Sequence, residues 1–207
     1  VDGLSDGLVE TNSIWVGNDP SGTTDDAEYN VALGTTALDA VTTGDFNVAV
    51  GYDGLTANTT GSSNTATGFQ ALKANTTGNY NSAFGTNSLL TNTTGGYNTA
   101  LGQSSLDANT EGDQNTAVGY NSLSANTTGT GNVAFGYNTL AANTTADQNL
   151  AIGYSALAVQ TSDGGFNTAI GNYSLDANTI GDKNVALGYG ALTQNTEGSY
   201  NIGIGYE

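Results

Sequence analysis

The sequence predicts an all-β fold, a parallel β-solenoid in which each turn of the chain is one repeat. Three observations support this: an asparagine returns at a fixed interval, an alanine and a glycine follow it at fixed distances, and strand-forming residues stand beside them. The interval is 17 residues, with a single interval of 18. The asparagines that open the repeats are Asn30, Asn47, Asn64, Asn81, Asn98, Asn115, Asn132, Asn149, Asn167, Asn184 and Asn201.

Each repeat is numbered from its asparagine. Position three is Ala up to Ala186, position five is Gly, position nine is Leu, and position thirteen is Thr. Seventeen residues with recurring glycines are unfavourable for a pair of helices. Valine, isoleucine and phenylalanine at position four favour a strand. We therefore expect a short strand over positions two to four, a glycine turn, a second segment around the leucine, and an Asn-Thr-Thr-Gly turn.

Stacking of these units follows from their size, because one repeat cannot bury its own apolar side chains. Parallel strands lie ~4.8 Å apart, so ten steps give a rod of roughly 50 Å. Identical side chains then form ladders along the rod. Leucine and alanine ladders are expected in a dry interior, and asparagine ladders at positions one and twelve.

Two regions are expected. Residues 1–29 hold seven acids, the only Trp and the only Pro, and are predicted to form a cap or connector with one degenerate coil at 13–17. Residues 30–207 form the solenoid, with ten full repeats and a partial eleventh. Because the sequence opens without an initiator Met or a leader peptide and stops mid-repeat, we expect a processed chain or a fragment.

The composition excludes several classes of function. The chain has no Cys and no His, so zinc sites, haem ligation and thiol or Ser–His catalysis are not expected, and we expect no cofactor. Two lysines, no arginine and a net charge of −17 argue against nucleic-acid binding and against anionic membrane surfaces. No apolar run reaches the length of a membrane span.

The strand pattern also predicts self-association. Positions two and four share one face of the strand and position three takes the other, yet both faces are apolar. One coil has one interior, so the second apolar face would form a long exposed stripe, which soluble monomers rarely show. We expect identical chains to cover it around an axis, as a homo-oligomer.

The repeat consensus Asn-Thr-Ala-x-Gly-x-x-Ala/Ser-Leu-x-x-Asn-Thr-Thr-Gly, as at 64–78 and 115–129, resembles repeats of phage tail-fibre and virion proteins, often found upstream of an endosialidase-type chaperone domain. Its Val/Thr-Ala-Leu/Ile-Gly core is also similar to the head repeats of trimeric autotransporter adhesins. The resemblance covers residues 13–206. It implies a left-handed β-roll, a homotrimer, and a place outside the cell or on a virion. Val41 at position twelve, Ala146 at position fifteen and the longer eighth copy depart from the pattern.

Several residues are candidate functional sites, and each also has a simpler structural interpretation. Asp147, Asp163 and Asp182 fall in turns of neighbouring coils, where carboxylates can bind Ca²⁺, but solvated turn aspartates are the favoured interpretation. A glycosidase would need one distinct carboxylate pair, and near-identical coils mark no such cleft, so no enzyme is expected. Asn-x-Ser/Thr sequons, which could be glycosylated but which turn chemistry also explains, occur at Asn58, Asn75, Asn92, Asn126, Asn143 and Asn172.

Position six carries an aromatic ladder that could bind a sugar or pack in an interface. The leading hypothesis is therefore a non-enzymatic structural rod of an extracellular or virion fibre that spaces or displays a receptor-binding part. The alternatives are an adhesin that binds a surface glycan through its aromatic, Asn and Thr ladders, and an ice-binding solenoid. The ladder comprises Tyr52, Phe69, Tyr120, Tyr137, Tyr154, Tyr189 and Tyr206.

Overall fold

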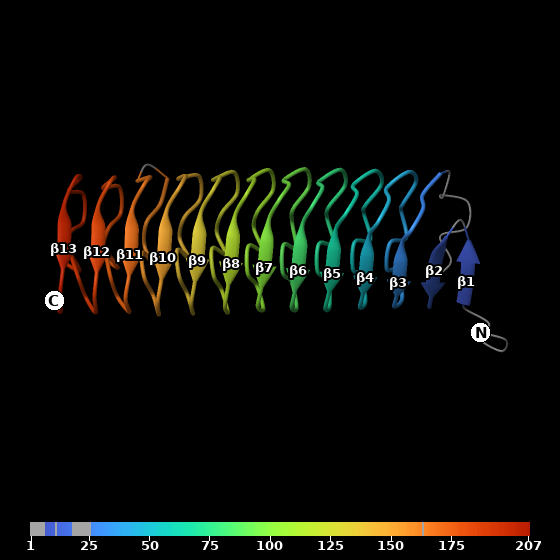
Figure 1. The fold of residues 1–207 in the computed structure, drawn as a ribbon, viewed down its shortest axis with the longest axis horizontal. Coiled ribbons are helices and arrows are strands. Elements are labelled where there is room, and N and C mark those ends of the chain that lie inside the picture. Colours follow the sequence, from blue (N-terminus) through green and yellow to red (C-terminus); the bar gives the residue numbers. More distant parts are fainter. Residues whose placement is uncertain (1–6, 11, 18–25, 163) are drawn as a thin grey trace.

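The computed structural model describes residues 7–10, 12–17, 26–162 and 164–207. They form a parallel β-solenoid, seen from the side in Figure 1 as a row of similar coils with the two chain ends at opposite ends of the rod. Every coil contributes one strand to a sheet whose order follows the sequence. The strands are β1 (Gly7–Glu10), β2 (Ser13–Val16), β3 (Val31–Leu33), β4 (Val48–Val50), β5 (Thr65–Thr67), β6 (Ser82–Phe84), β7 (Thr99–Leu101), β8 (Thr116–Val118), β9 (Val133–Phe135), β10 (Leu150–Ile152), β11 (Thr168–Ile170), β12 (Val185–Leu187) and β13 (Ile202–Ile204).

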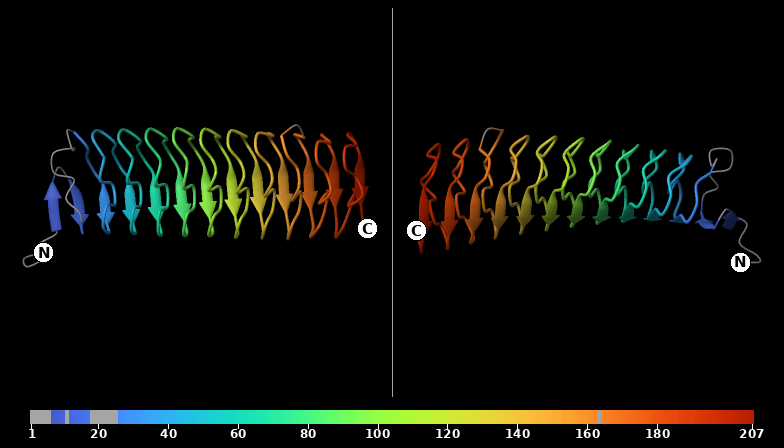
Figure 2. Two further views of the ribbon diagram at one scale, coloured as in Figure 1. Left: turned by 180° about the vertical axis from the view of Figure 1, so that it is seen from behind. Right: turned by 45° about the horizontal axis from the view of Figure 1, so that its top comes forward.

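Register confirms the predicted stacking. From β2 to β13 the strands are parallel, and each residue pairs with the same position of the next coil, as Ala66 does with Ala83. The 18-residue interval does not disturb this, because Ala151 still pairs with Ala169. At the other end β1 runs antiparallel to β2, with Leu8 opposite Trp15. Figure 2 shows this hairpin at the N-terminal end of the row.

Alanine and leucine ladders fill the interior, as predicted. The central residue of a strand points inward, so Ala83 and Ala100 are fully buried, and Leu89 and Leu106 approach them from the opposite wall. From β3 to β12 the inward strand position carries only a methyl group, whereas in β2 the same position holds Trp15, which pairs with Ala32. Trp15 is 1% exposed and belongs to the same core cluster.

The glycine at position five lets successive coils approach closely. A Cβ at Gly85 would lie 2.6 Å from the carbonyl oxygen of Gly102, and the φ angle of +135° is one that other residues rarely adopt. The leucine at position nine also has a positive φ, 50° at Leu89. That conformation costs an L-residue about 1–2 kcal/mol, and burial of the whole leucine side chain offsets it.

Two asparagine ladders tie neighbouring coils together, which confirms the expectation for positions one and twelve. At position one, the backbone N–H of Asn47 donates to Oδ1 of Asn30 at 2.8 Å, and Nδ2 of Asn47 donates to the carbonyl of Gly61 at 2.9 Å. At position twelve, Nδ2 of Asn75 donates to Oδ1 of Asn58 at 2.8 Å. These amides are fully buried, so their pairing is required for stability.

Candidate functional site

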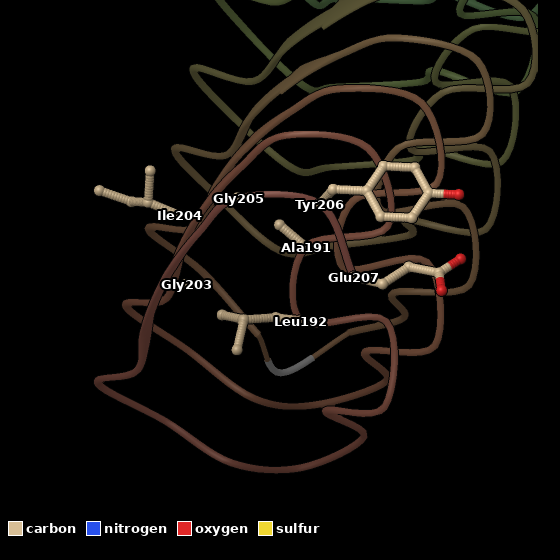
Figure 3. A pocket seen from close by; sticks show the side chains of 7 residues that line it. All are labelled: Ala191, Leu192, Gly203, Ile204, Gly205, Tyr206 and Glu207. Atoms are coloured by element: carbon tan, nitrogen blue, oxygen red, sulfur yellow. The ribbon is translucent and has the colours of Figure 1, made fainter.

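The outer face of the sheet carries a row of exposed apolar side chains along the rod. In β3 to β12 the first and third residues of the strand point outward, opposite to the buried alanine. Figure 3 shows this at the last coil, where Ile204 projects away from the interior. The side chains are substantially exposed, with Phe135 at 54% and Leu101 at 49%. The predicted apolar stripe is therefore present on the single chain.

Charge is excluded from this outer face. The chain carries 19 acids, yet the outward positions of β3 to β13 hold no charged residue. Their polar side chains are the hydroxyls of Thr65, Thr67, Ser82, Thr99, Thr116 and Thr168. Strands three residues long and ~4.8 Å apart give a stripe on the order of 50 Å by 10 Å, or about 500 Å². That is at the upper end of what a soluble monomer exposes.

The aromatic residues at position six stack in two groups, which the coils of Thr86 and Gln103 separate. Tyr137 and Tyr154 stack with ring centroids 5.2 Å apart and planes 4° from parallel, and Tyr52 stacks on Phe69 at 5.5 Å. Tyr137 has a ring on both sides, whereas Tyr52, Phe69 and Tyr120 each adjoin a coil without a ring at position six, at Thr35, Thr86 and Gln103. Sugars stack on exposed ring faces. The ladder also lies away from the outer sheet face, because Tyr206 and Ile204 point to opposite sides of the coil (Figure 3).

Sequence reasoning missed one member of this ladder, Tyr173 at position seven. Position six of that coil is Asn172, and the ring of Tyr173 stands edge-on to Tyr154 and Tyr189, with centroid distances of 5.3 and 5.7 Å. Loss of solvent around it, together with the neighbouring tyrosines, raises the pKa of the Tyr173 phenol. Because Tyr173 is at position seven and the other rings are at position six, the 17-residue period did not identify it.

The position-sixteen aspartates act as hydrogen-bond acceptors between coils. Oδ1 of Asp147 accepts the N–H of Thr130 at 2.6 Å, and Oδ1 of Asp113 accepts the N–H of Gly96 at 2.7 Å. Asp182 accepts from Lys183. Asp163 lies outside the described residues. In the part of the chain that the structure describes, no group of three or more carboxylates lies close enough to hold a metal ion.

Five of the six sequon asparagines are buried, and the sixth, Asn172, is exposed, with its Oδ1 accepting the N–H of Tyr154 at 2.9 Å. The sequon asparagines Asn58, Asn75, Asn92, Asn126 and Asn143 are fully buried in the position-twelve ladder, so an oligosaccharyltransferase cannot reach them in the folded chain. Position-thirteen hydroxyls are also occupied: Oγ1 of Thr59 donates to the carbonyl of Thr76 at 3.1 Å. These threonines therefore do not offer a free hydroxyl array to ice.

A hollow of about 260 Å³ opens at the last coil, between Leu192, Gly203 and Tyr206 (Figure 3). Every earlier coil is covered on this side by the next one, so the hollow is the place that a further coil would fill, and we assign it no ligand. No helix of the described residues is long and apolar enough to cross a membrane. Comparisons with protein-family models, with curated proteins and with solved structures find no match to this chain.

Proposed function

We propose that this chain is a non-enzymatic structural module, a stiff rod in an extracellular or virion fibre that spaces or displays a receptor-binding part. The observation that carries the proposal is the uncharged outer face of the sheet on a chain of net charge −17. The acids of the solenoid lie outside this face, in turns such as those of Asp45, Asp113 and Asp147, so identical rods repel one another least through the outer face.

The mechanical part of the proposal rests on repetition. Each coil is joined to the next by backbone hydrogen bonds, by two buried amide ladders and by close glycine contacts. Such a stack resists bending and offers proteases few extended segments. Its place outside the cell is proposed from the resemblance of the repeats to fibre and adhesin repeats.

Three copies packed by their outer faces around one axis are the expected assembly, since heterologous contacts that close form rings. The mass in solution tests this: a trimer of a 20.8 kDa chain has three times that mass, about 62 kDa. Phe135→Asp would place a carboxylate on the stripe and is expected to give monomers. A wild-type chain that stays monomeric at high concentration would contradict the proposal.

Thr94→Glu is the matched control. Thr94 is exposed at position fourteen, where Glu111 and Glu197 stand in other coils, so a carboxylate there is compatible with the fold. This variant adds a charge without touching the outer face and should keep the wild-type mass. Circular dichroism of both variants verifies that the solenoid is intact.

The adhesin alternative depends on the aromatic ladder. A glycan array probed with wild type and with Tyr137→Ala separates the two functions, because specific binding lost in the variant would favour the adhesin. Stacked ring faces at Tyr137 and Tyr154 weigh against it.

A further inference from the structure

A second set of aromatic rings lies at position seventeen, and at Ser63 a single coil without a ring separates two stacked pairs. Other coils without a ring at this position carry Gln114, Gly131, Gln148 and Lys183. Tyr29 stacks on Phe46 with centroids 5.0 Å apart and planes 5° from parallel, and Tyr80 stacks on Tyr97 at 4.9 Å and 17°. The coil between these pairs carries Ser63. Its φ of 59° matches the 58° of Phe46 and the 59° of Tyr80, so the backbone is the same and only the ring is absent.

This interruption leaves two ring faces opposite each other. Phe46 uses one face for Tyr29 and Tyr80 uses one for Tyr97, and their other faces look across the coil of Ser63. Two strand steps separate these rings by about 10 Å. Subtracting the thickness of the rings leaves a slot of roughly 6 Å, since carbon atoms approach to about 3.5 Å. Phe46 and Tyr80 are each more than half exposed, so the slot is open to solvent.

The same set of rings shows what fills such a slot elsewhere. In the coils of Phe166 and Tyr200, the residue between the rings is Lys183. Its Nζ lies 6.0 Å from the centroid of Phe166 and 4.9 Å from that of Tyr200. The ammonium also donates to Oδ2 of Asp182 at 2.7 Å and to the hydroxyl of Tyr200 at 3.1 Å. An ammonium between two aromatic rings is thus a native arrangement of this rod.

The charge of the whole chain favours the same kind of occupant. Asp45 precedes Phe46, and its Oδ1 accepts the N–H of Glu28 in the preceding coil at 2.8 Å, on the side of Phe46 away from Ser63. The residue equivalent to Asp182 at this slot is Ser62. The whole chain carries a net charge of −17, which raises the local concentration of cations. Ring faces attract cations, and a quaternary ammonium is about as wide as the slot.

We propose that the slot formed by Phe46, Ser63 and Tyr80 binds an alkylammonium group supplied from outside the chain. The source is either the side chain of a lysine on another protein or a small quaternary ammonium compound. Because the slot is open, we expect a dissociation constant on the order of millimolar. This proposal is independent of the structural role argued above.

Saturation-transfer NMR on the full chain tests the site, with choline as the probe. We expect saturation to reach the choline methyl protons and their resonance to move upfield, because they lie over two ring faces. The neutral control is 3,3-dimethylbutan-1-ol, which has the shape of choline without its charge, and its signal should be several-fold weaker. Equal signals from the two compounds, or no transfer to choline at tens of millimolar, would overturn the proposal.

Two variants locate the binding. Ser63→Tyr places a ring on a backbone that carries tyrosine at position 80 and closes the slot, so choline binding should fall at least five-fold. Phe69→Leu removes a ring of the position-six ladder and should leave binding unchanged. If Ser63→Tyr keeps its circular dichroism and also keeps choline binding, the proposed site is wrong.

A third probe, the amide of Nα-acetyl-lysine, distinguishes the two sources. Binding as strong as that of choline indicates a lysine side chain as the natural occupant. Binding of choline alone indicates a quaternary ligand. Ser63→Lys provides an internal check, since its ammonium should occupy the slot as Lys183 does and exclude both probes.

Discussion

Nδ2 of Asn143 donates to Oδ1 of Asn126 at 2.9 Å, but Oδ1 of Asn143 accepts nothing in return. The next coil has Gln160 in place of asparagine, and its Nε2 turns to Oδ1 of Asn149 at 3.4 Å. The upstream amide ladder therefore ends at Asn143. Downstream, Oε1 of Gln160 accepts from Nδ2 of Asn178, so the longer coil is joined to the rest of the ladder.

This interruption predicts that two equivalent substitutions have unequal costs. Asn126→Ala removes the donor to Asn109 and the acceptor for Asn143, whereas Asn143→Ala removes only a donor. Each buried polar group left unpaired costs about 1–3 kcal/mol, so Asn126→Ala should destabilise the fold by about 1 kcal/mol more. Denaturant unfolding of both variants measures the difference. Gln103→Ala, at an exposed side chain, is the control and should be nearly neutral. Equal losses for the two asparagines would contradict the interrupted ladder.

The close approach of the coils predicts that alanine is far more destabilising at Gly85 than at Gly54. Gly85→Ala would force a Cβ to within 2.6 Å of a backbone oxygen at a φ of +135°, and should destabilise the fold by ~3 kcal/mol or more. Gly54→Ala meets nothing nearer than 3.7 Å, and its position is alanine in the coils of Ala37 and Ala71. Thermal unfolding should show a large loss for Gly85→Ala and little change for Gly54→Ala. If Gly85→Ala unfolds at the wild-type temperature, the coils do not approach as closely at Gly85 and Gly102 as the structure shows.

The buried carboxylate of Asp53 predicts acid sensitivity. Nζ of Lys73 lies 2.8 Å from its Oδ2, and this contact, with the hydroxyl of Thr36, lowers the pKa of Asp53. Because the folded pKa lies below the unfolded value of about 3.9, the stabilisation is complete above pH ~4 and is lost as the pH falls through the folded pKa. Asp53→Asn should thus be less stable than wild type at pH 7. The difference should shrink below pH ~4, as measured by unfolding across pH. A difference that is constant from pH 7 to pH 2 would exclude this linkage.

The carboxyl of Asp107 predicts a pH dependence of folding stability opposite to that of Asp53. Partial burial raises the pKa of its carboxyl, so folding favours the protonated form. The cost of the charged form is absent below pH ~4 and grows as the pH rises through the folded pKa. Asp107→Asn removes the charge and should stabilise the chain at neutral pH, with no gain at pH 3. Unfolding curves at the two pH values test this, and a gain that is the same at both would refute it.

Much of the fold could be predicted because each strong positional preference has one physical cause. Asparagine at two fixed positions implied amide ladders, alanine at position three implied a narrow interior or a close contact, and glycine at position five implied a tight turn. The positive φ of Leu89 could not be predicted, since leucine disfavours that conformation and only burial in this interior offsets it. The antiparallel pairing of β1 with β2 also gave no repeat signal.

The candidate surfaces were predicted less completely than the fold. Periodicity identified the outer apolar stripe and the position-six rings, because both recur at the repeat length. It did not reveal that Tyr173, at position seven, would join the ladder and stand edge-on to its neighbours. The slot at Ser63 was equally hidden, since a missing ring is meaningful only once its neighbours are known to stack.

Each strand of the sheet pairs only with the strands before and after it in sequence. No coil thus depends on the total number of coils, and insertion or deletion of one 17-residue segment would alter the molecule's length by about 5 Å without rebuilding either terminus. Gene-level duplication can therefore adjust the reach of such a molecule in small uniform increments.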